Sequence, residues 1–346
     1  MKVDGISTLN IQNALQSSVS RSQRALLRAQ IEYSTGRHED VGLTLGRSIS
    51  TNLSLRSQIS AFDNLKTIHG VAATRAALTQ AGLDQLTDVA NTFISALSGA
   101  RTAQNGQQLA EEAARTAYSA IWQVLETTYD GQAIFSGINT GTPGLTKYPG
   151  SAAASAIDNA FLTAFGFLPT SPLAVNITPS QLQNHLDTSF QQEFQDPNWN
   201  ANWSAASPVT PLTALEGGAK ANLSATANSQ AIRNLVQSVV SVLSTSRGQL
   251  SSSTFSELTD HAMAGTSEAV LGIANEQARI GIGQEELNRS TERIAKKSDL
   301  LKARVQESEG VDQYEAAMRM NQLMTQLEAS YALTAKISKL TLADYL

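Results

Sequence analysis

Hydrophobic residues recur at alternating spacings of three and four from Phe62 to Leu97. Nine of the eleven positions in this series are apolar, and the two polar ones are His69 and Thr79. An a/d pattern sustained over about five heptads is typical of a coiled coil. At 1.5 Å per residue the segment is roughly 54 Å long, so it predicts a long rod-forming helix. The seam residues predicted here are Phe62, Leu65, Leu83, Leu86, Phe93 and Leu97.

A second seam lies near the other end of the chain, where an aliphatic residue recurs every seven positions. Three glycines, Gly272, Gly281 and Gly283, each cost about 1 kcal/mol relative to alanine in a helix, so we expect the early part of this helix to bend or fray. Antiparallel pairing of the two seams is the economical topology. The residues of the second seam are Ile273, Ile280, Leu287, Ile294 and Leu301.

Two shorter helices are predicted between the seams. One runs from Gln107 to about Thr128, after an Asn-Gly turn, and carries alanine and aliphatic residues on its inner face. The other begins at Asn228, a plausible N-cap, and continues through Leu243. Together with the two seams they predict one helical bundle.

Each end of the chain carries a single amphipathic helix with a narrow apolar stripe. The first stops at Gly36, and the last is separated from the rod by the segment 308–310. Two such helices alone bury little apolar surface against the entropy of ordering them, so we expect them to become ordered among many copies. The predicted assembly interface consists of Ile11, Leu15, Val19, Leu26, Tyr33, Met320, Leu323, Leu327, Tyr331, Ile337 and Leu340.

All eight prolines lie between Pro143 and Pro211, and a proline inside a helix costs about 3 kcal/mol. Five of the nine phenylalanines and two of the three tryptophans lie in the same part of the chain. The four-residue spacing of Trp199 and Trp203 favours one face of a local core over an exposed recognition surface. This segment therefore predicts a small inserted domain with its own core.

The predicted fold is mainly α: an elongated, antiparallel helical coiled-coil bundle with a terminal helix pair and a small inserted α+β domain. Residues 1–36 and 312–346 form the paired terminal helices. Residues 37–140 and 219–311 form the rod, and residues 141–218 form the inserted outer domain.

Composition excludes several classes of function. The chain has no cysteine, which rules out disulfides, thiol catalysis and thiolate metal sites. A net charge of −5 argues against a nucleic-acid partner. The chain contains no run of about 18 apolar residues that would predict a membrane span. Its first 20 residues lack the apolar core of a cleaved secretion signal. We therefore predict neither a nucleic-acid nor a membrane partner.

No catalytic arrangement is evident from the residues. The four histidines are scattered without metal-ligand spacing. The segment from Gly42 to Ser48 is one residue too short for a phosphate-binding loop and carries arginine in place of its lysine. We predict no catalytic residue, no cofactor and no metal, and a protein that is not an enzyme.

Several short segments resemble the flagellin family. They are Ile-Ser-Thr-Leu at 6–9, Tyr-Ser-Thr-Gly-Arg at 33–37 and Ile-Phe-Ser-Gly at 134–137. Residues 327–331 and 337–346 resemble the ending of the hook–filament junction proteins of that family, also called hook-associated protein type 3. A turn of the Pro-Asp-Asp-Pro type that the family carries after Arg37 is replaced by His-Glu-Asp-Val, so the resemblance implies no conformation for residues 38–47.

The resemblance implies a structural adaptor of the bacterial flagellum that joins hook to filament by helix packing and is needed for motility. The implied partners are further copies of the chain in a ring, hook-associated protein type 1 on the hook side, flagellin, and an export chaperone at the C-terminal helix. The implied location is extracellular, after type III export without a cleaved signal. Two alternatives stay open: flagellin itself, against which Ser330-Tyr331 and the Asp-Tyr-Leu ending argue, and a cytoplasmic coiled-coil scaffold or signalling protein.

Overall fold

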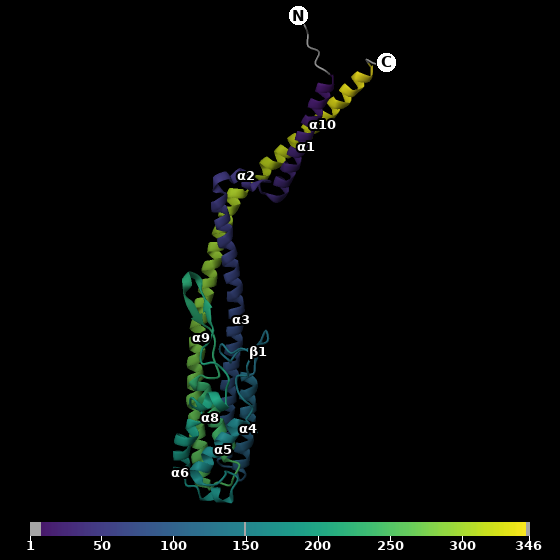
Figure 1. Cartoon of the computed structure of the whole chain (residues 1–346). Helices are drawn as coiled ribbons and strands as arrows, with labels where there is room; N and C mark the ends of the chain where they lie inside the picture. Colours follow the sequence, from purple (N-terminus) through teal and green to yellow (C-terminus); the bar gives the residue numbers. More distant parts are fainter. Residues whose placement is uncertain (1–7, 149, 344–346) are drawn as a thin grey trace. The chain divides into compact units, whose positions relative to one another are not determined.

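The computed structural model describes the backbone of residues 8–148 and 150–343, and the side-chain environments of residues 13–148 and 150–336 (Figure 1). Contacts divide the chain into two compact units. The first unit comprises Met1–Asn64 and Arg293–Leu346, and the second comprises Leu65–Glu292. The fold is mainly helical, as predicted, with two small two-stranded sheets in the described part of the chain. The three-part division into residues 1–36 with 312–346, 37–140 with 219–311, and 141–218 stays a prediction.

Two long helices, α3 (Ile49–Ala100) and α9 (Ser252–Glu309), each contribute to both units. Within the second unit their contacts run in opposite directions along the two helices. His69 meets Thr291 and Gln80 meets Gln277, while Arg101, directly after α3, meets Asp260. Because the residue numbers rise along α3 while those of the partners on α9 fall, the two helices are antiparallel, as the paired seams predicted.

The glycines of α9 do not fray it, because the helix is continuous from Ser252 to Glu309. Two of them, Gly272 and Gly283, lie where other segments approach closely. A Cβ atom on Gly272 would lie 2.7 Å from the Cβ of Ala231, and one on Gly283 would lie 2.9 Å from the carbonyl oxygen of Asn222. These two glycines are therefore required by packing against neighbouring segments.

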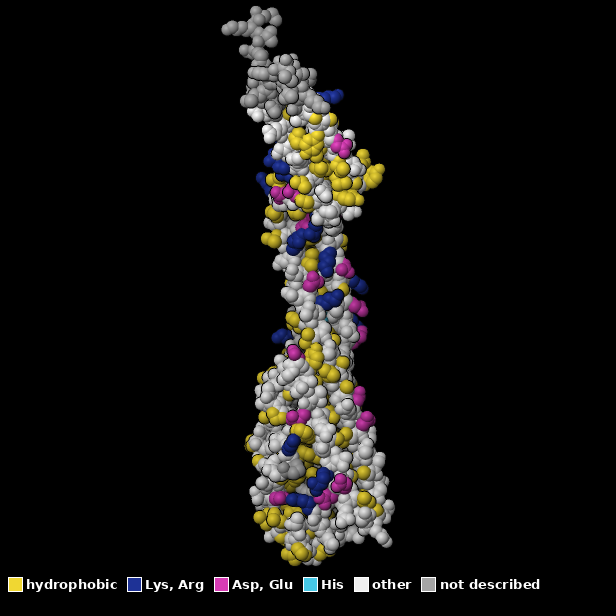
Figure 2. Space-filling view, turned by 90° about the vertical axis from the view of Figure 1, so that its right-hand side faces the viewer, with side chains coloured by type: hydrophobic (Ala, Val, Ile, Leu, Met, Phe, Trp, Pro, Cys, Tyr) yellow, Lys and Arg dark blue, Asp and Glu magenta, His cyan; other side chains and the backbone are white. Residues whose placement is uncertain are grey.

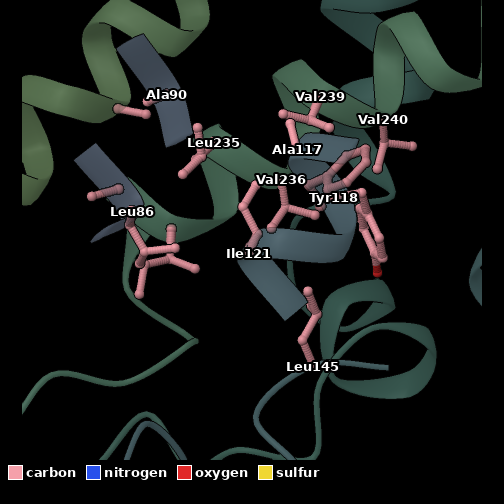
Figure 3. Close-up of a cluster of buried hydrophobic side chains, with 14 of the residues drawn as sticks. Leu86, Ala90, Ala117, Tyr118, Ile121, Leu145, Leu235, Val236, Val239 and Val240 are labelled. Atoms are coloured by element: carbon pink, nitrogen blue, oxygen red, sulfur yellow. The ribbon is translucent and has the colours of Figure 1, made fainter. Parts of the chain in front are cut away.

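The core of the second unit lies where α4 (Gly106–Leu125) and α8 (Gln230–Thr245) pack together beside α3 (Figure 3). Leu86 of α3, Ile121 of α4 and Val236 of α8 are all fully buried there. The two predicted helices are confirmed, with one correction: Ser229, not Asn228, is the N-cap of α8. The side-chain amide of Asn228 instead accepts a hydrogen bond from Trp199 Nε1 and donates one to the carbonyl of Ala206.

The proline-containing segment belongs to the second unit. Its short elements are α5 (Ala152–Phe165), η2 (Pro172–Asn176), α6 (Pro179–His185), η3 (Leu186–Phe190) and α7 (Asn198–Asn202). Trp199 and Trp203 are fully buried and stacked, with ring centroids 6.0 Å apart, which confirms the core interpretation. Strands β1 (Thr128–Tyr129) and β2 (Gln132–Ala133) precede this segment.

A second hairpin follows the proline-containing segment. It pairs β3 (Leu212–Ala214) with β4 (Lys220–Asn222), and η4 (Glu216–Gly218) forms its turn. The pairing connects residues on both sides of the predicted domain boundary at 218, so the two strands belong together structurally.

In the first unit, α1 (Thr8–Thr35) and α10 (Gln313–Ala343) pack against each other (Figure 1). Helix α1 ends before Gly36, as predicted, and Gly36 has φ +66°, the left-handed conformation that glycine adopts without a Cβ clash. Residues 38–47, for which the sequence implied no conformation, contain α2 (Val41–Leu45). Asp40 caps this helix, because its Oδ1 accepts a hydrogen bond from the amide of Leu43 at 2.8 Å. The short helix η1 (Gly46–Ser48) then leads into α3.

Candidate assembly surface

The most deeply buried positions between α1 and α10 carry small residues. Ala29 and Ala316 are almost completely buried, and such side chains let two helix backbones approach closely. Polar contacts fix the pairing at its margins: the side-chain amide of Gln23 donates to the hydroxyl of Tyr331 at 2.6 Å, and Arg319 pairs with Glu32 at 3.6 Å. The terminal helices therefore meet within one chain through a narrow seam.

Large apolar side chains remain exposed on the same two helices (Figure 2). Leu27 and Ile31 lie one turn apart on α1, and Tyr314 and Met318 lie one turn apart on α10; Leu27 and Met318 are each 59 % exposed. Apolar surface left in water costs about 25 cal/mol per Å² relative to its buried state, so these positions gain stability when another surface covers them. We call the following set the outer apolar residues: Leu27, Ile31, Tyr33, Tyr314, Met318, Met324, Tyr331 and Leu333.

The predicted interface residues fall into three groups. Leu15, Val19, Leu26, Met320, Leu323 and Leu327 are half-buried, whereas Tyr33 and Tyr331 are exposed. The side chains of Ile11, Ile337 and Leu340 lie outside the described residues. Leu27, Ile31 and Met318 were missed, because a search for one apolar stripe per helix finds the face that packs within the chain. Leu27, Ile31 and Met318 could have been identified as large apolar residues that lie outside that stripe.

The predicted seam residues of α3 and α9 lie on inward-facing positions. Leu83, Leu86, Phe93, Leu97, Ile273, Ile280, Leu287 and Ile294 are buried, and Phe62, Leu65 and Leu301 are half-buried. His69 is 1 % exposed on the α3 seam. Its Nε2 donates to the carbonyl of Ala214 at 3.0 Å, and its Nδ1 lies 2.8 Å from Thr291 Oγ1. His69 thus connects α3, α9 and the β3–β4 hairpin.

A buried carboxylate organises the first unit where its helices meet. Glu309, the last residue of α9, has a side chain that is 1 % exposed. Its Oε1 accepts from Arg56 Nε at 2.8 Å, and its Oε2 accepts from Arg56 Nη2 at 2.5 Å and lies 3.2 Å from Arg37 Nη2. Hydrogen bonding to Arg56 lowers the pKa of Glu309 below its ordinary value. We call Glu309, Arg37, Arg56 and Asn52 the Glu309 clasp.

Backbone contacts reinforce the clasp. The amide of His38 donates to the carbonyl of Glu309 and the amide of Val311 donates to the carbonyl of Gly36, both at 3.0 Å. The clasp therefore fastens the end of α1 to the beginning of α3 and the end of α9. From the sequence, residues 308–310 were interpreted only as a break between the rod helix and the last helix. The signal that could have indicated the clasp was the charged Glu309 between two apolar stripes.

Two kinds of site were searched for among the described residues. No group of three or more His, Asp or Glu side chains among the described residues is arranged to hold a metal ion. Across that same part, none of the helices combines the length and hydrophobicity that a membrane-spanning segment requires. What the surface does provide is apolar side chains on helices, which suit packing against other proteins.

Comparison with known proteins gives two family matches and a likeness to solved structures, one of which is described here. Residues 6–140 match the bacterial flagellin N-terminal helical region, and residues 263–346 match the bacterial flagellin C-terminal helical region. No curated protein sequence matches the chain. A solved protein from Vibrio parahaemolyticus, described as a flagellar hook-associated protein, has a similar fold: the TM-score is 0.52 at 10 % identity over 76 % of this chain and 97 % of that one.

The two matched regions cover well over half of the chain and contain both of its antiparallel arms. They include α1 with α10 and most of α3 and α9, and the inserted segment lies between them. The order and pairing of the helices thus agree with the sequence matches at both ends, and the chain belongs to the flagellin family.

Proposed function

We propose that this protein is the hook–filament junction subunit of the bacterial flagellum, a structural adaptor and not an enzyme. Membership of the flagellin family gives it a structural role in the flagellum, outside the cell, as a subunit that assembles with others. The observation that carries the proposal is the set of outer apolar residues on α1 and α10. Their exposure supports a surface that becomes covered when subunits pack.

The proposed mechanism is helix packing between subunits. Copies of the chain form a ring, with α1 and α10 turned toward neighbouring subunits and residues 141–218 turned outward. A ring joining two unlike polymers presents different surfaces to each of them, here to hook-associated protein type 1 on one side and to flagellin on the other. The junction serves flagellum-dependent motility.

The proposal includes a route of export, which the resemblance to the family implies. The protein leaves the cell through the type III pathway without a cleaved signal peptide. Apolar side chains of α10 such as Met318 and Met324 are exposed in the single chain and create an association hazard before assembly. An export chaperone that covers the C-terminal helix removes that hazard. The structural likeness to a protein described as hook-associated is in keeping with this proposal.

A second candidate is flagellin itself, because both matching family regions are those of flagellin. The two candidates differ in self-assembly. A filament subunit polymerises into long filaments from purified protein, whereas a junction subunit forms a ring of limited size and needs flagellin to continue. Electron microscopy of the purified chain, with and without flagellin, separates them.

The decisive experiment uses a strain that lacks the gene, complemented with defined variants. Without the protein, hooks should lack filaments while flagellin accumulates in the medium. Leu27→Asp should be secreted but should not restore filaments, because covering an unpaired charge costs several kcal/mol. Leu173→Asp is the matched control, since Leu173 is similarly exposed but lies in the inserted segment. Filaments on the hooks of the deletion strain would contradict the proposal.

A further inference from the structure

A cavity of about 800 Å³ opens in the second unit between α4, α5, the segment before α5 and the end of α8. Its lining carries three cations, Arg115, Lys147 and Arg247, and one carboxylate, Asp158. The whole chain has a net charge of −5, so this cation-rich lining differs from the average surface.

One wall of the cavity is aromatic and held in place. Tyr118 and Trp122 lie one turn apart on α4, on the same face as Arg115. The hydroxyl of Tyr118 donates to the carbonyl of Thr146 at 2.7 Å, and Trp122 Nε1 donates to the carbonyl of Leu145 at 3.1 Å. Because both polar groups are used to fix their own rings, the wall is pre-organised for contact with a flat or ring-shaped ligand.

The three cations are not equivalent. Arg247 pairs with Asp158 and also donates through Nε to the carbonyl of Ser244, and Arg115 pairs with Glu111 at 2.9 Å. The ammonium of Lys147 lies 4.5 Å from the ring centroid of Trp122. A cation–π contact uses the charge but none of the three N–H donors of an ammonium group. Lys147 acts on the Glu126 carboxylate through its charge alone, and among the described residues it makes no ion pair like those of the two arginines. Lys147 is therefore the cation best suited to bind an anion beside Trp122.

A second polar group at this cavity has an unmet hydrogen bond. Tyr148 is 6 % exposed, and its hydroxyl has no hydrogen-bond partner in the described part of the chain. A buried hydroxyl without a partner costs about 1–3 kcal/mol. The charges of Arg247 and Asp158 both act on this hydroxyl, so it belongs to the side of the cavity that carries this ion pair.

We infer that this cavity binds a small carboxylate with a ring-shaped body. The ring packs against the half-buried Trp122, which stands beside the buried Tyr118, and the carboxylate pairs with Lys147. The volume falls within the range of about 300–1,000 Å³ that is usual for small-molecule sites. Asp158 disfavours polyanions and is able to accept a hydrogen bond from a ring hydroxyl. Both sugar acids and aromatic acids have this chemistry.

Isothermal titration calorimetry on the full chain tests the inference with two pairs of probes. Glucuronate is compared with glucose, and 4-hydroxybenzoate with 4-hydroxybenzyl alcohol. At least one acid should bind about tenfold more tightly than its neutral counterpart, the ratio expected for one added hydrogen-bonded charge pair. The pair that shows this difference identifies the ligand as a sugar acid or an aromatic acid.

Variants then locate the binding. Lys147→Met should lose about tenfold in affinity for the acid, and Lys147→Arg should retain it, because the charge is kept. Lys220→Met is the matched control, since Lys220 is an exposed lysine on β4 and is not part of the cavity lining. Unchanged circular dichroism confirms that each variant is folded. If neither acid is preferred over its neutral counterpart, or if Lys147→Met binds like Lys220→Met, the inference is overturned.

Discussion

Replacing Glu309 by glutamine removes the negative charge of the Glu309 clasp while keeping the size of the side chain. In the native protein this carboxylate has two hydrogen bonds from Arg56 and an ion pair with Arg37. The amide of glutamine retains one acceptor oxygen and directs an NH₂ group toward an arginine. The substitution therefore removes the ion pairing and at least one hydrogen bond in the first unit.

The magnitude follows from burial. Breaking a fully buried ion pair by removing one partner costs about 3–5 kcal/mol. Here the carboxylate is 1 % exposed, but the Arg56 and Arg37 side chains are 45 % and 43 % exposed. Both arginines regain hydration when the charge is lost, so the cost falls below that range. We expect Glu309→Gln to lower the unfolding free energy of the first unit by about 2 kcal/mol.

The assay uses the distribution of tryptophans. Trp122, Trp199 and Trp203 all lie in the second unit, so tryptophan fluorescence reports that unit, whereas far-ultraviolet circular dichroism reports helices in both. In urea, Glu309→Gln should lower the urea concentration of the early part of the dichroism transition by about 1 M. The reason is that the unfolding free energy of small units falls by about 1–3 kcal/mol per M of urea. The fluorescence transition should move far less.

Glu307→Gln is the matched control, because Glu307 is two residues away and exposed. Equal transitions for the two variants would refute the reasoning. Acid offers a second readout: the folded-state pKa of Glu309 is lowered, so its contribution is present above the unfolded-state value of about 4.3. It is lost as the pH falls through the folded-state pKa, and this loss should be absent in Glu309→Gln.

Three further predictions concern the second unit. Burial lowers the pKa of His185 to about 4. The stability contributed by the neutral imidazole is therefore present above the unfolded-state pKa of about 6.5, and about 3 kcal/mol of it is lost as the pH falls to 4. His185→Gln should flatten that part of the stability profile measured by fluorescence. Trp203→Ala should cost about 3–5 kcal/mol in urea unfolding, because it empties a fully buried site. Gly283→Ala should lower the thermal midpoint, because its Cβ would meet the Asn222 carbonyl, whereas Gly99→Ala, with open space around it, should raise stability by up to about 1 kcal/mol.

The sequence was sufficient for the long helices of this protein, but not for short elements such as α2 or the β3–β4 hairpin. Heptad spacing and the confinement of proline to one segment predicted the helices, because both depend on the geometry of a single helix. The four-residue spacing of Trp199 and Trp203 likewise predicted a local core. The end of α1 was also accessible, since Gly36 terminates it through its own backbone preference.

Only the tertiary structure decided how these elements meet. The bonds of His69 to Thr291 and Ala214, and those of Glu309 to Arg37 and Arg56, join residues far apart in the chain. Periodicity gives the inward face of a helix but not the residue opposite each position, which depends on the register between helices. The same limit hid most of the outer apolar residues, of which only Tyr33 and Tyr331 were in the predicted interface. Leu27 and Met318 are exposed because the partner helix in the chain covers only the narrow stripe that the sequence had shown.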